Sequence, residues 1–589
     1  MTDRAAIALA ALAWLGAVLG LRTGLGPPTV VAAVAVVVAL GLRRPPLLLA
    51  VIALLTSGRA VDDARSLSPP PTGDMTAWAT LLSDPEVRDG GAVRVEVRVG
   101  TRHLLATARG ESGARLQRRS AGQQVLIVGR TGRSPPGSHW LERRHIVGQL
   151  AIDDVRADAP GSLIVRVANG VRDLLARSAE ALPAQQRGLY LGFVLGDDRG
   201  QPVEIVDDFR GSGLSHLLAV SGQNVAFVLA FASPVLRRCG LRARWSATIG
   251  VIGLFALITR FEPSVLRASV MAALAATASM LGREASGLRV LSLAVAALLV
   301  LDPFLVDSAG FQLSVAASAA ILVVSHRLAA RLPGPRPLAE AVAVSAAAQI
   351  GVAPILVATF GGAPVSGLLA NVLAAPAAGP VMVWGVAAGL AGGALGPGIA
   401  TVLHLPTRVL IWWIAVVAER GARWPLGQLR GGEVVVVLVG VACVVALRRS
   451  GKASGAALVI AGLLAPAAAQ AATPPVLVAL DGASLWRAGG ATVLVVGGRA
   501  HADTVLTGLR EAGVDRIDLV VVTVSSRDAI VDVVATRTLV RAVVRPGDVD
   551  VPAVVQCGGL EVLLEPSADG VTAIVRAVGA RAPPAQPSA

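Results

Sequence analysis

Residues 215–225 read SHLLAVSGQNV and place five polar side chains in a stretch that is otherwise apolar enough to cross a bilayer. These side chains are Ser215, His216, Ser221, Gln223 and Asn224. Each costs roughly 0.5 kcal/mol to several kcal/mol in hydrocarbon unless it pairs with another group or faces a wet cavity. The stretch therefore predicts a site or a pathway inside a membrane.

The helical pattern of this stretch predicts two different faces. On one continuous helix His216 and Gln223 are seven residues apart and share a face. Ser215, Ala219 and Gly222 form a stripe of small residues beside it. The first face suits a polar lining, and the second suits close packing against a neighbouring helix.

The composition of the whole chain indicates an integral membrane protein. Of its 589 residues, 54% are hydrophobic and 16% are charged, and the mean hydropathy is +0.66, above that of ordinary soluble enzymes. We predict a polytopic α-helical protein with about 11 to 13 apolar segments. The net charge of +14 fits either cytoplasmic loops that follow the positive-inside rule or the attraction of a polyanion.

Arginine-rich links between the apolar segments predict the orientation of the chain. Arg43 and Arg44 place the amino terminus in the cytoplasm and residue 58 outside. Three later links are also assigned to the cytoplasm, at 237–244, 326–336 and 448–452. All three links can lie in the cytoplasm only if the segment at 364–393 crosses the membrane once.

Prolines in the later segments predict interrupted helices. Pro376 and Pro380 lie inside the segment at 364–393, which we therefore expect to be discontinuous or re-entrant. Pro354 is expected to shape another broken helix.

Changes in pattern divide the chain into five regions. They are N-terminal transmembrane helices at 1–58, a soluble β domain at 59–160, a transmembrane domain at 161–471 with an amphipathic lead-in helix, an α/β domain at 472–580 and a disordered tail at 581–589. The predicted orientation places both soluble domains outside the cytoplasm.

The β domain carries a large positive charge. Valine alternates with charged residues over 93–99, as in a half-buried strand. Between residues 88 and 144 the sequence contains twelve arginines but only four acidic residues. This pattern fits a solvated strand face or a nucleic-acid footprint, and aromatic stacking partners other than Trp140 are scarce. The candidate DNA contacts are Arg94, Arg98, Arg118 and Arg119.

Five strings stand out in the membrane region. They are LGDD at 195–198, GLSHLLAVSGQNV at 213–225, PSVLRASVMA at 263–272, DPFLVDSAGFQLSVAASA at 302–319, and the pair AAAQIGVAPILVATFGG and LLANVLAAPAAGP between 346 and 380. Together they resemble the ComEC competence-protein family, the inner-membrane channel that passes single-stranded DNA during natural transformation. The serine-histidine string and GFQLS are its most specific parts.

The resemblance implies an OB-type β domain and a C-terminal domain of metallo-β-lactamase type. It also implies a multi-pass protein of the cytoplasmic membrane, with a DNA receptor outside and a helicase or other ATPase inside. Transport could be driven by that cytoplasmic partner or by the proton gradient. The oligomeric state stays open. The residues expected to line the DNA path are Ser215, His216, Ser221, Gln223, Asn224, Arg267, Gln312, Ser314 and Asn371.

The C-terminal domain departs from the family's metal signature, Thr-His-x-His-x-Asp-His. The matching residues 523–529 read TVSSRDA, so every signature histidine is missing. Asp528 alone cannot hold a hydrolytic metal, and the three cysteines are too far apart for a metal-binding spacing. We therefore expect a degenerate domain and assign no catalytic residue, metal or cofactor. No phosphate-binding loop is present for ATP.

Each path residue also has a structural interpretation. His216 could be a core histidine, Arg267 could snorkel to the interface rather than face phosphates, and neutral polar groups could join helices. On a helix Ser221 points about 140° away from His216, which argues against a serine hydrolase. The alternatives to a DNA channel are a secondary transporter of a small polar or anionic solute and a non-conducting membrane scaffold.

Overall fold

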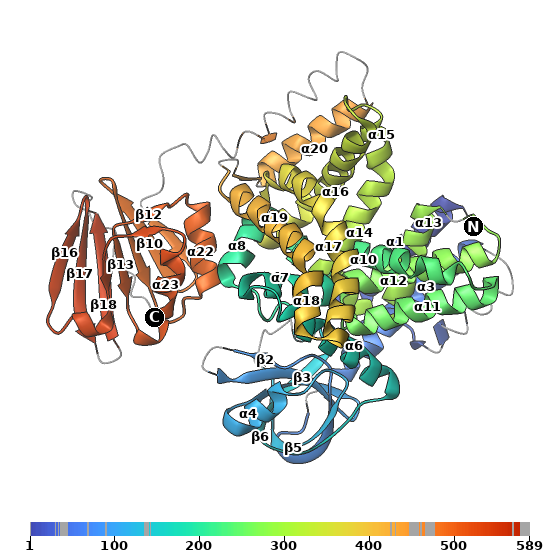
Figure 1. Cartoon of the computed structure of the whole chain (residues 1–589), viewed down its shortest axis with the longest axis horizontal. Helices are drawn as coiled ribbons and strands as arrows, with labels where there is room; N and C mark the ends of the chain where they lie inside the picture. The colour runs from blue at the N-terminus through green and yellow to red at the C-terminus, as the bar shows by residue number, and fades with distance from the viewer. Residues whose placement is uncertain are drawn as a thin grey trace. The chain divides into compact units, whose positions relative to one another are not determined.

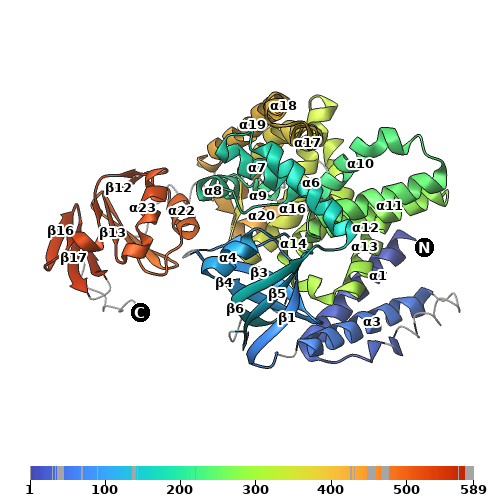
Figure 2. The same cartoon turned by 60° about the horizontal axis from the view of Figure 1, so that its bottom comes forward.

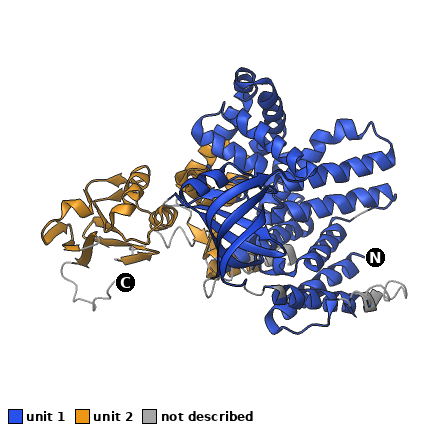
Figure 3. Ribbon diagram, turned by 90° about the horizontal axis from the view of Figure 1, so that it is seen from below, with its two compact units in different colours: residues 1–200, 216–359, 375–412 blue, residues 201–215, 360–374, 413–589 orange. Residues whose placement is uncertain are grey.

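The computed structural model divides into two compact units (Figure 3). The first comprises residues 1–200, 216–359 and 375–412, and the second comprises residues 201–215, 360–374 and 413–589. The structure describes residues 2–577 apart from 30, 33–34, 36–44, 68–69, 89–90, 135–140, 142, 219, 285, 425–426, 430, 447–458, 460–461, 464, 466–476 and 568–569. The predictions outside these residues concern Arg43 and Arg44, Trp140, the link at 448–452, most of the apolar segment at 456–470 and the tail at 581–589.

A closed β-barrel forms one part of the first unit. Its strands are β1 (Gly73–Leu81), β3 (Val93–Val99), β4 (Arg102–Ala108), β5 (Gln124–Arg133) and β6 (Ile146–Ala159), and the short β2 (Glu86–Val87) adds to β3. The order is β1-β5-β6-β4-β3, and pairing of β1 with β3 closes the barrel (Figures 1 and 2). β4 and β6 run parallel, and helix α4 (Gly110–Gln117) connects β4 to β5. The predicted β domain is confirmed.

The alternating sequence of β3 decides which side chains fill the barrel. Val93, Val95 and Val97 are buried in its core, whereas the charged residues between them lie on the other face. The barrel begins only at Gly73, because the preceding helix α3 (Pro45–Ser66) continues past residue 58.

Several described helices are suited to a membrane. Five are long and apolar enough to cross it, and a bent pair would make a sixth span. The five are α1 (Asp3–Thr23), α11 (Leu241–Ile258), the run α14 (Ala309–Ala320), η3 (Ile321–Ser325) and α15 (His326–Ala329), then α16 (Arg336–Phe360) and α17 (Gly367–Leu395). The bent pair is α18 (Pro397–Leu403) and α19 (Leu405–Ala422), and shorter or less apolar helices are α7 (Ala184–Leu195), α10 (Gly222–Leu236), α12 (Pro263–Met280) and α13 (Gly287–Leu301). These helices fit a multi-pass membrane protein, and the number of about 11 to 13 segments stays a prediction.

The polar stretch at 215–225 is not one continuous helix. Helix α9 (Ser215–Leu218) has four residues, and α10 begins at Gly222 after an extended N-cap residue, Ser221. The prediction that His216 and Gln223 share one helical face is therefore wrong. Of the predicted stripe of small residues, Ser215 and Gly222 belong to different helices, and Ala219 lies outside the described residues. The extended backbone at Ser221 interrupts the helix, although hydropathy continues through it.

The prolines do not interrupt the later helices. Pro354 lies inside the continuous helix α16, and both Pro376 and Pro380 lie inside α17. The predicted discontinuous helix over 364–393 is therefore wrong, because packed neighbours can accommodate the backbone groups that proline leaves free in a membrane helix. The bend lies instead between α18 and α19, where the two axes differ by 53°.

The amphipathic lead-in helix is present as α6 (Leu163–Ala179), with an unexpected distribution of exposure. Its apolar Leu163 and Ile164 are 67% and 65% exposed, which suits contact with a bilayer surface. Arg172, a charged residue that an amphipathic helix would be expected to hold on its polar face, is only 7% exposed. It is buried against the acidic partners Asp84 and Asp197.

The second unit contains the α/β pattern predicted from residue 474 onward. One sheet has the order β15-β13-β11-β10-β9, and a second has the order β16-β17-β18. Their bounds are β9 (Leu477–Leu480), β10 (Ala483–Ala488), β11 (Ala491–Val496), β13 (Leu519–Val522), β15 (Val543–Val544), β16 (Ala553–Cys557), β17 (Leu560–Ser567) and β18 (Gly570–Ala577), with helices α22 (Ala502–Glu511) and α23 (Ala529–Ala535). Helix α8 (Val203–Gly211) belongs to this unit, and its Asp207 pairs with Arg510 at 3.2 Å.

Candidate functional site

The break between α9 and α10 is held by polar contacts with two other helices. The Ser221 hydroxyl donates to Asn224 Oδ1 at 3.2 Å, and Asn224 Nδ2 donates to the Phe193 carbonyl of α7 at 3.0 Å. From α12, the Ser264 hydroxyl donates to the Val220 carbonyl at 2.8 Å. The Val220 carbonyl at the break therefore accepts its hydrogen bond from a side chain of another helix.

Arg267 lies next to this break and is 8% exposed. Its Nε donates to Ser314 Oγ on α14 at 2.7 Å, and its Nη1 lies 3.1 Å from Met271 Sδ. A Cβ added to Gly222 would lie 2.6 Å from Arg267 Nη2, so only glycine lets the guanidinium approach this closely. Three of the five strings thus meet at one arginine. We call Ser221, Gly222, Asn224, Ser264, Arg267 and Ser314 the Arg267 cluster.

The charge of Arg267 has no acidic counterpart within the described part of the chain. Its hydrogen-bond partners there are a hydroxyl and a thioether, both neutral. A buried cation with only neutral partners is costly in a membrane segment and marks a functional site by default. The cluster therefore presents a positive charge that an anion could neutralise.

The other predicted path residues are placed differently. Gln312 Nε2 donates to the Val306 carbonyl at 2.7 Å, and His216 and Gln223 have exposed side chains. Ser215 and Asn371 belong to the second unit, where the Ser215 hydroxyl donates to the Phe209 carbonyl at 3.4 Å. The structure brings together Ser221, Asn224, Arg267 and Ser314 from the predicted set.

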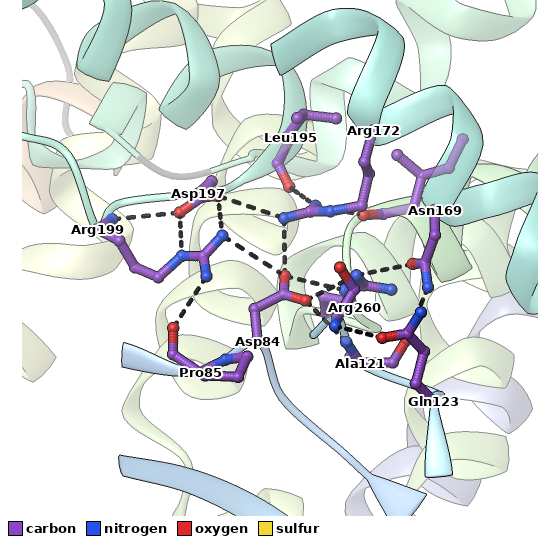
Figure 4. Close-up of polar contacts among 12 residues, drawn as sticks. Asp84, Pro85, Ala121, Gln123, Asn169, Arg172, Leu195, Asp197, Arg199 and Arg260 are labelled. Carbon is purple, nitrogen blue, oxygen red and sulfur yellow. Dashed lines mark hydrogen bonds and ion pairs between the residues drawn. The ribbon is translucent and has the colours of Figure 1, made fainter. Parts of the chain in front are cut away.

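A second polar cluster joins the barrel to the helices of the first unit (Figure 4). Asp84, between β1 and β2, accepts from Arg172 of α6 and from Arg260 after α11, each at 2.8 Å. Asp197, from the LGDD string, pairs with Arg199 at 2.5 Å and with Arg172 at 3.5 Å. We call Asp84, Arg172, Asp197, Arg199 and Arg260 the Asp84 network.

The electrostatics of this network favour the ionised carboxylate of Asp84. Burial alone would raise its pKa, but the charges of Arg172 and Arg260 lower the pKa to about 2. Burial also lowers the pKa of Arg172, against the opposing charge of Asp84. The network is a buried, mutually satisfied set of ion pairs.

The network has two further features. Asn169 of α6 accepts from Arg260 Nη2 at 2.9 Å and donates to the Ala121 carbonyl of the barrel at 3.2 Å. Arg260 and the following Phe261 have φ angles of 57° and 58°, in the left-handed region. This turn between α11 and α12 is therefore strained and is held by its polar partners.

The end of α7 connects the two clusters. The Phe193 carbonyl binds Asn224 of the Arg267 cluster, and the Leu195 carbonyl accepts from Arg172 Nη1 at 3.3 Å. Sequence reasoning missed the Asp84 network. The one available signal was the acidic LGDD string, because Asp84 and the arginines resemble ordinary surface charges in the sequence.

The arginines proposed for DNA contact in the barrel differ in their surroundings. Arg119 pairs with Asp158 at 2.8 Å, whereas Arg94 and Arg98 lie on the outer face of β3 and Arg118 is exposed after α4. Sequence reasoning also missed Trp78, which is 47% exposed on β1. Its neighbour Thr80 is the register partner of Arg98, so Trp78 and Arg98 share a face.

Residues 523–529, where the resemblance places a metal signature, include a short 3₁₀ helix at Ser525–Arg527. Arg545 Nε donates to Asp528 Oδ1 at 2.7 Å, so an arginine binds the single carboxylate of this loop. Among the described residues, no three histidine, cysteine, aspartate or glutamate side chains gather to hold a metal ion.

Comparisons with known proteins find similarities in the region that contains the Arg267 cluster. A family model described as Competence protein matches residues 193–451. ComE operon protein 3 of Bacillus subtilis (strain 168) is 25% identical over 226 residues, which are 38% of this chain and 29% of the relative. Uncharacterized protein YcaI of Escherichia coli (strain K12) is 30% identical over 210 residues, 33% of this chain and 28% of the relative.

The matched regions span less than a third of the length of each of these relatives. No solved structure matches the chain. The family model nevertheless covers most of the region in which the helical break, Arg267 and Ser314 meet. The match of the Competence protein model to residues 193–451, together with the similarity to ComE operon protein 3, confirms the resemblance.

Proposed function

We propose that the chain forms a conduit for single-stranded DNA through the cytoplasmic membrane. Buried Arg267 is the observation that carries the proposal, because its partners in the described chain are neutral. A passing phosphodiester would supply the negative charge, and a guanidinium is always charged and forks onto phosphate oxygens. The match to the Competence protein family model supports DNA as the cargo.

The break between α9 and α10 suits such a conduit. Ser221 and Gly222 expose an irregular backbone next to Arg267, and irregular backbone at membrane depth is tolerated where it is packed in protein or lines a wet cavity. Gln223 and His216 add exposed polar groups near the break. Several weak contacts of this kind would let a strand bind and move on.

We propose that the barrel is an OB-type domain that receives the strand outside the cell. Support comes from its strand order, its parallel β4–β6 pair and the helix before β5. Arg94 and Arg98 lie on its second long strand, β3, and Trp78 offers an aromatic face beside them. Bases stack on exposed aromatic rings while arginines contact phosphates.

The C-terminal domain is proposed to be a degenerate metallo-β-lactamase-like domain without hydrolytic activity. The pairing of Asp528 with Arg545 supports this, because the carboxylate already has a cationic partner. The energy for transport would come from a cytoplasmic helicase or other ATPase, and a receptor would deliver DNA outside. The amino terminus is proposed to be cytoplasmic and both soluble domains extracytoplasmic.

DNA uptake by variants of the full-length chain tests the conduit. The host is a naturally transformable strain that lacks its own competence-family protein, and nuclease-protected labelled DNA is measured at matched membrane levels. We expect the wild-type chain to restore uptake and Arg267→Ala to lower it by about tenfold or more, equivalent to about 1.4 kcal/mol. Arg267→Lys should be intermediate, because lysine keeps the charge but loses the planar fork.

The control is Arg336→Ala, which removes an exposed arginine paired with Glu340 at the start of α16. It should leave uptake unchanged. Wild-type uptake by Arg267→Ala would contradict the role of Arg267. Failure of the wild-type chain to restore uptake would contradict the conduit and favour a solute transporter or a scaffold.

A further inference from the structure

A cavity of 320 Å³ lies at the ends of α10, α11 and α12, which run side by side in Figures 1 and 2. Its polar lining comes from all three helices and the turn between α10 and α11. The residues are Ser233, Arg237, Arg244, Trp245, Thr248 and Ser279. None of them belongs to the Arg267 cluster or to the Asp84 network.

The cavity has a strong positive charge. Residues 237–244 read RRCGLRAR, with four arginines and no acidic residue. Arg237 and Arg244 line the cavity and are exposed, and neither forms an ion pair with a described residue. The hydroxyls of Ser233 and Ser279 add hydrogen-bond donors. This combination of guanidinium and hydroxyl groups suits a phosphate.

Large apolar side chains are exposed on the same helices. Val235, Leu241 and Leu281 are 64%, 49% and 61% exposed. In a membrane protein such side chains contact acyl chains. The Trp245 indole donates to Thr277 Oγ1 at 3.0 Å, which fixes an aromatic ring beside the basic groups. Tryptophan and arginine together are typical of the level where headgroups meet hydrocarbon.

We propose that this cavity binds the phosphate of an anionic phospholipid headgroup, with Arg237 and Arg244 as its main ligands. Arginine-rich links face the cytoplasm, whose leaflet carries anionic lipids, and basic pockets between helices on that side bind such headgroups. The adjoining apolar side chains favour a lipid over nucleic acid or free phosphate, because only a lipid brings acyl chains to this surface. The inference does not depend on DNA passage.

Lipid binding by the purified full-length protein tests the proposal. The probe is phosphatidylglycerol in mixed micelles at physiological ionic strength, with phosphatidylcholine as the zwitterionic comparison, and retained lipid is counted by native mass spectrometry. The double variant Arg237→Gln/Arg244→Gln should bind phosphatidylglycerol about tenfold more weakly than wild type. Phosphatidylcholine binding should not change.

The matched control is Arg238→Gln/Arg242→Gln, which removes the same charge from the same turn but spares the cavity lining. It should bind phosphatidylglycerol like wild type, and equal weakening by both double variants would overturn the proposal. Competition by inorganic phosphate or by a single-stranded oligonucleotide at micromolar concentration would also overturn it, in favour of a soluble phosphate or DNA site. The unfolding midpoint without added lipid shows that each variant is folded.

Discussion

Arg172 and Arg267 are both buried arginines of the first unit, but their partners differ in charge. Arg172 pairs with Asp84 at 2.8 Å and with Asp197 at 3.5 Å, whereas Arg267 contacts a hydroxyl and a thioether. A buried cation that is fully paired has its desolvation offset within the protein. A buried cation with neutral partners has no anion to offset its desolvation, so binding of an anion would stabilise it. The first arrangement holds the barrel, and the second suits the proposed binding of a passing phosphate group.

The largest expected effect comes from removing the central carboxylate of the Asp84 network. Asp84→Ala leaves Arg172 and Arg260 buried without their shared partner, which should cost about 3 to 5 kcal/mol of apparent unfolding free energy. Unfolding in detergent micelles measures this cost. The control is Asp74→Ala, at an exposed position on β1, which should cost less than about 0.5 kcal/mol. Equal losses of unfolding free energy in Asp84→Ala and Asp74→Ala would contradict the view that Arg172 is a paired, structural arginine in contrast to Arg267.

Acid should weaken the same network. The pKa of Asp84 is about 2 in the folded chain against an ordinary 3.8, so its ionised form stabilises the fold above pH ~3.8. This stabilisation, about 2 to 3 kcal/mol, should be lost as the pH falls through 2. The measurement is the unfolding midpoint between pH 5 and 2 for wild type and Asp84→Asn. An equally steep decline in both proteins would show that other carboxylates dominate.

A methyl group at the break should disturb the Arg267 cluster by overpacking. In Gly222→Ala the new Cβ would meet Arg267 Nη2 at 2.6 Å and Ala268 Cβ at 3.0 Å. We expect a cost of about 2 kcal/mol and reduced DNA uptake. Gly250→Ala in α11 is the control, because the added Cβ would have no heavy atom within 4 Å. This substitution should stabilise the protein by about 0.5 to 1 kcal/mol. Similar behaviour of both alanines would mean that the break tolerates repacking.

The smallest effect is expected at a second contact between barrel and helices, where His145 Nε2 lies 3.2 Å from Asp302 Oδ1. This hydrogen bond raises the pKa of His145. Its stabilisation is therefore complete below pH ~6.5 and is lost as the pH rises through the higher folded value. His145→Gln should flatten a decline of a few tenths of a kcal/mol between pH 6 and 8. The exposed His326→Gln should leave that decline intact.

The sequence was informative where local pattern determines structure. Alternating valines predicted the buried face of β3, and polar residues in apolar strings predicted Ser221, Asn224, Arg267 and Ser314 as members of a site. It could not show the break at Ser221, because the hydroxyl that holds the Val220 carbonyl comes from Ser264, 44 residues away. Nor could it show that prolines would remain inside α17, since packing by neighbouring helices decides that outcome.

The Asp84 network could not be predicted from local sequence patterns for a related reason. Asp84 and Arg172 are 88 residues apart, and each resembles a solvated surface charge in an arginine-rich chain. Only the closure of the barrel and its contact with α6 bring them together. Trp78 was missed because a single aromatic residue in a strand is equally compatible with the core.

The left-handed turn at Arg260 and Phe261 carries information about biogenesis. Two consecutive non-glycine residues with positive φ cost about 1 to 3 kcal/mol each. The groups that hold Arg260 in this turn are Asp84 from the barrel and Asn169 from α6. We therefore expect the hairpin of α11 and α12 to reach its final shape after the barrel has folded and docked. Synthesis from the amino terminus delivers the parts in that order.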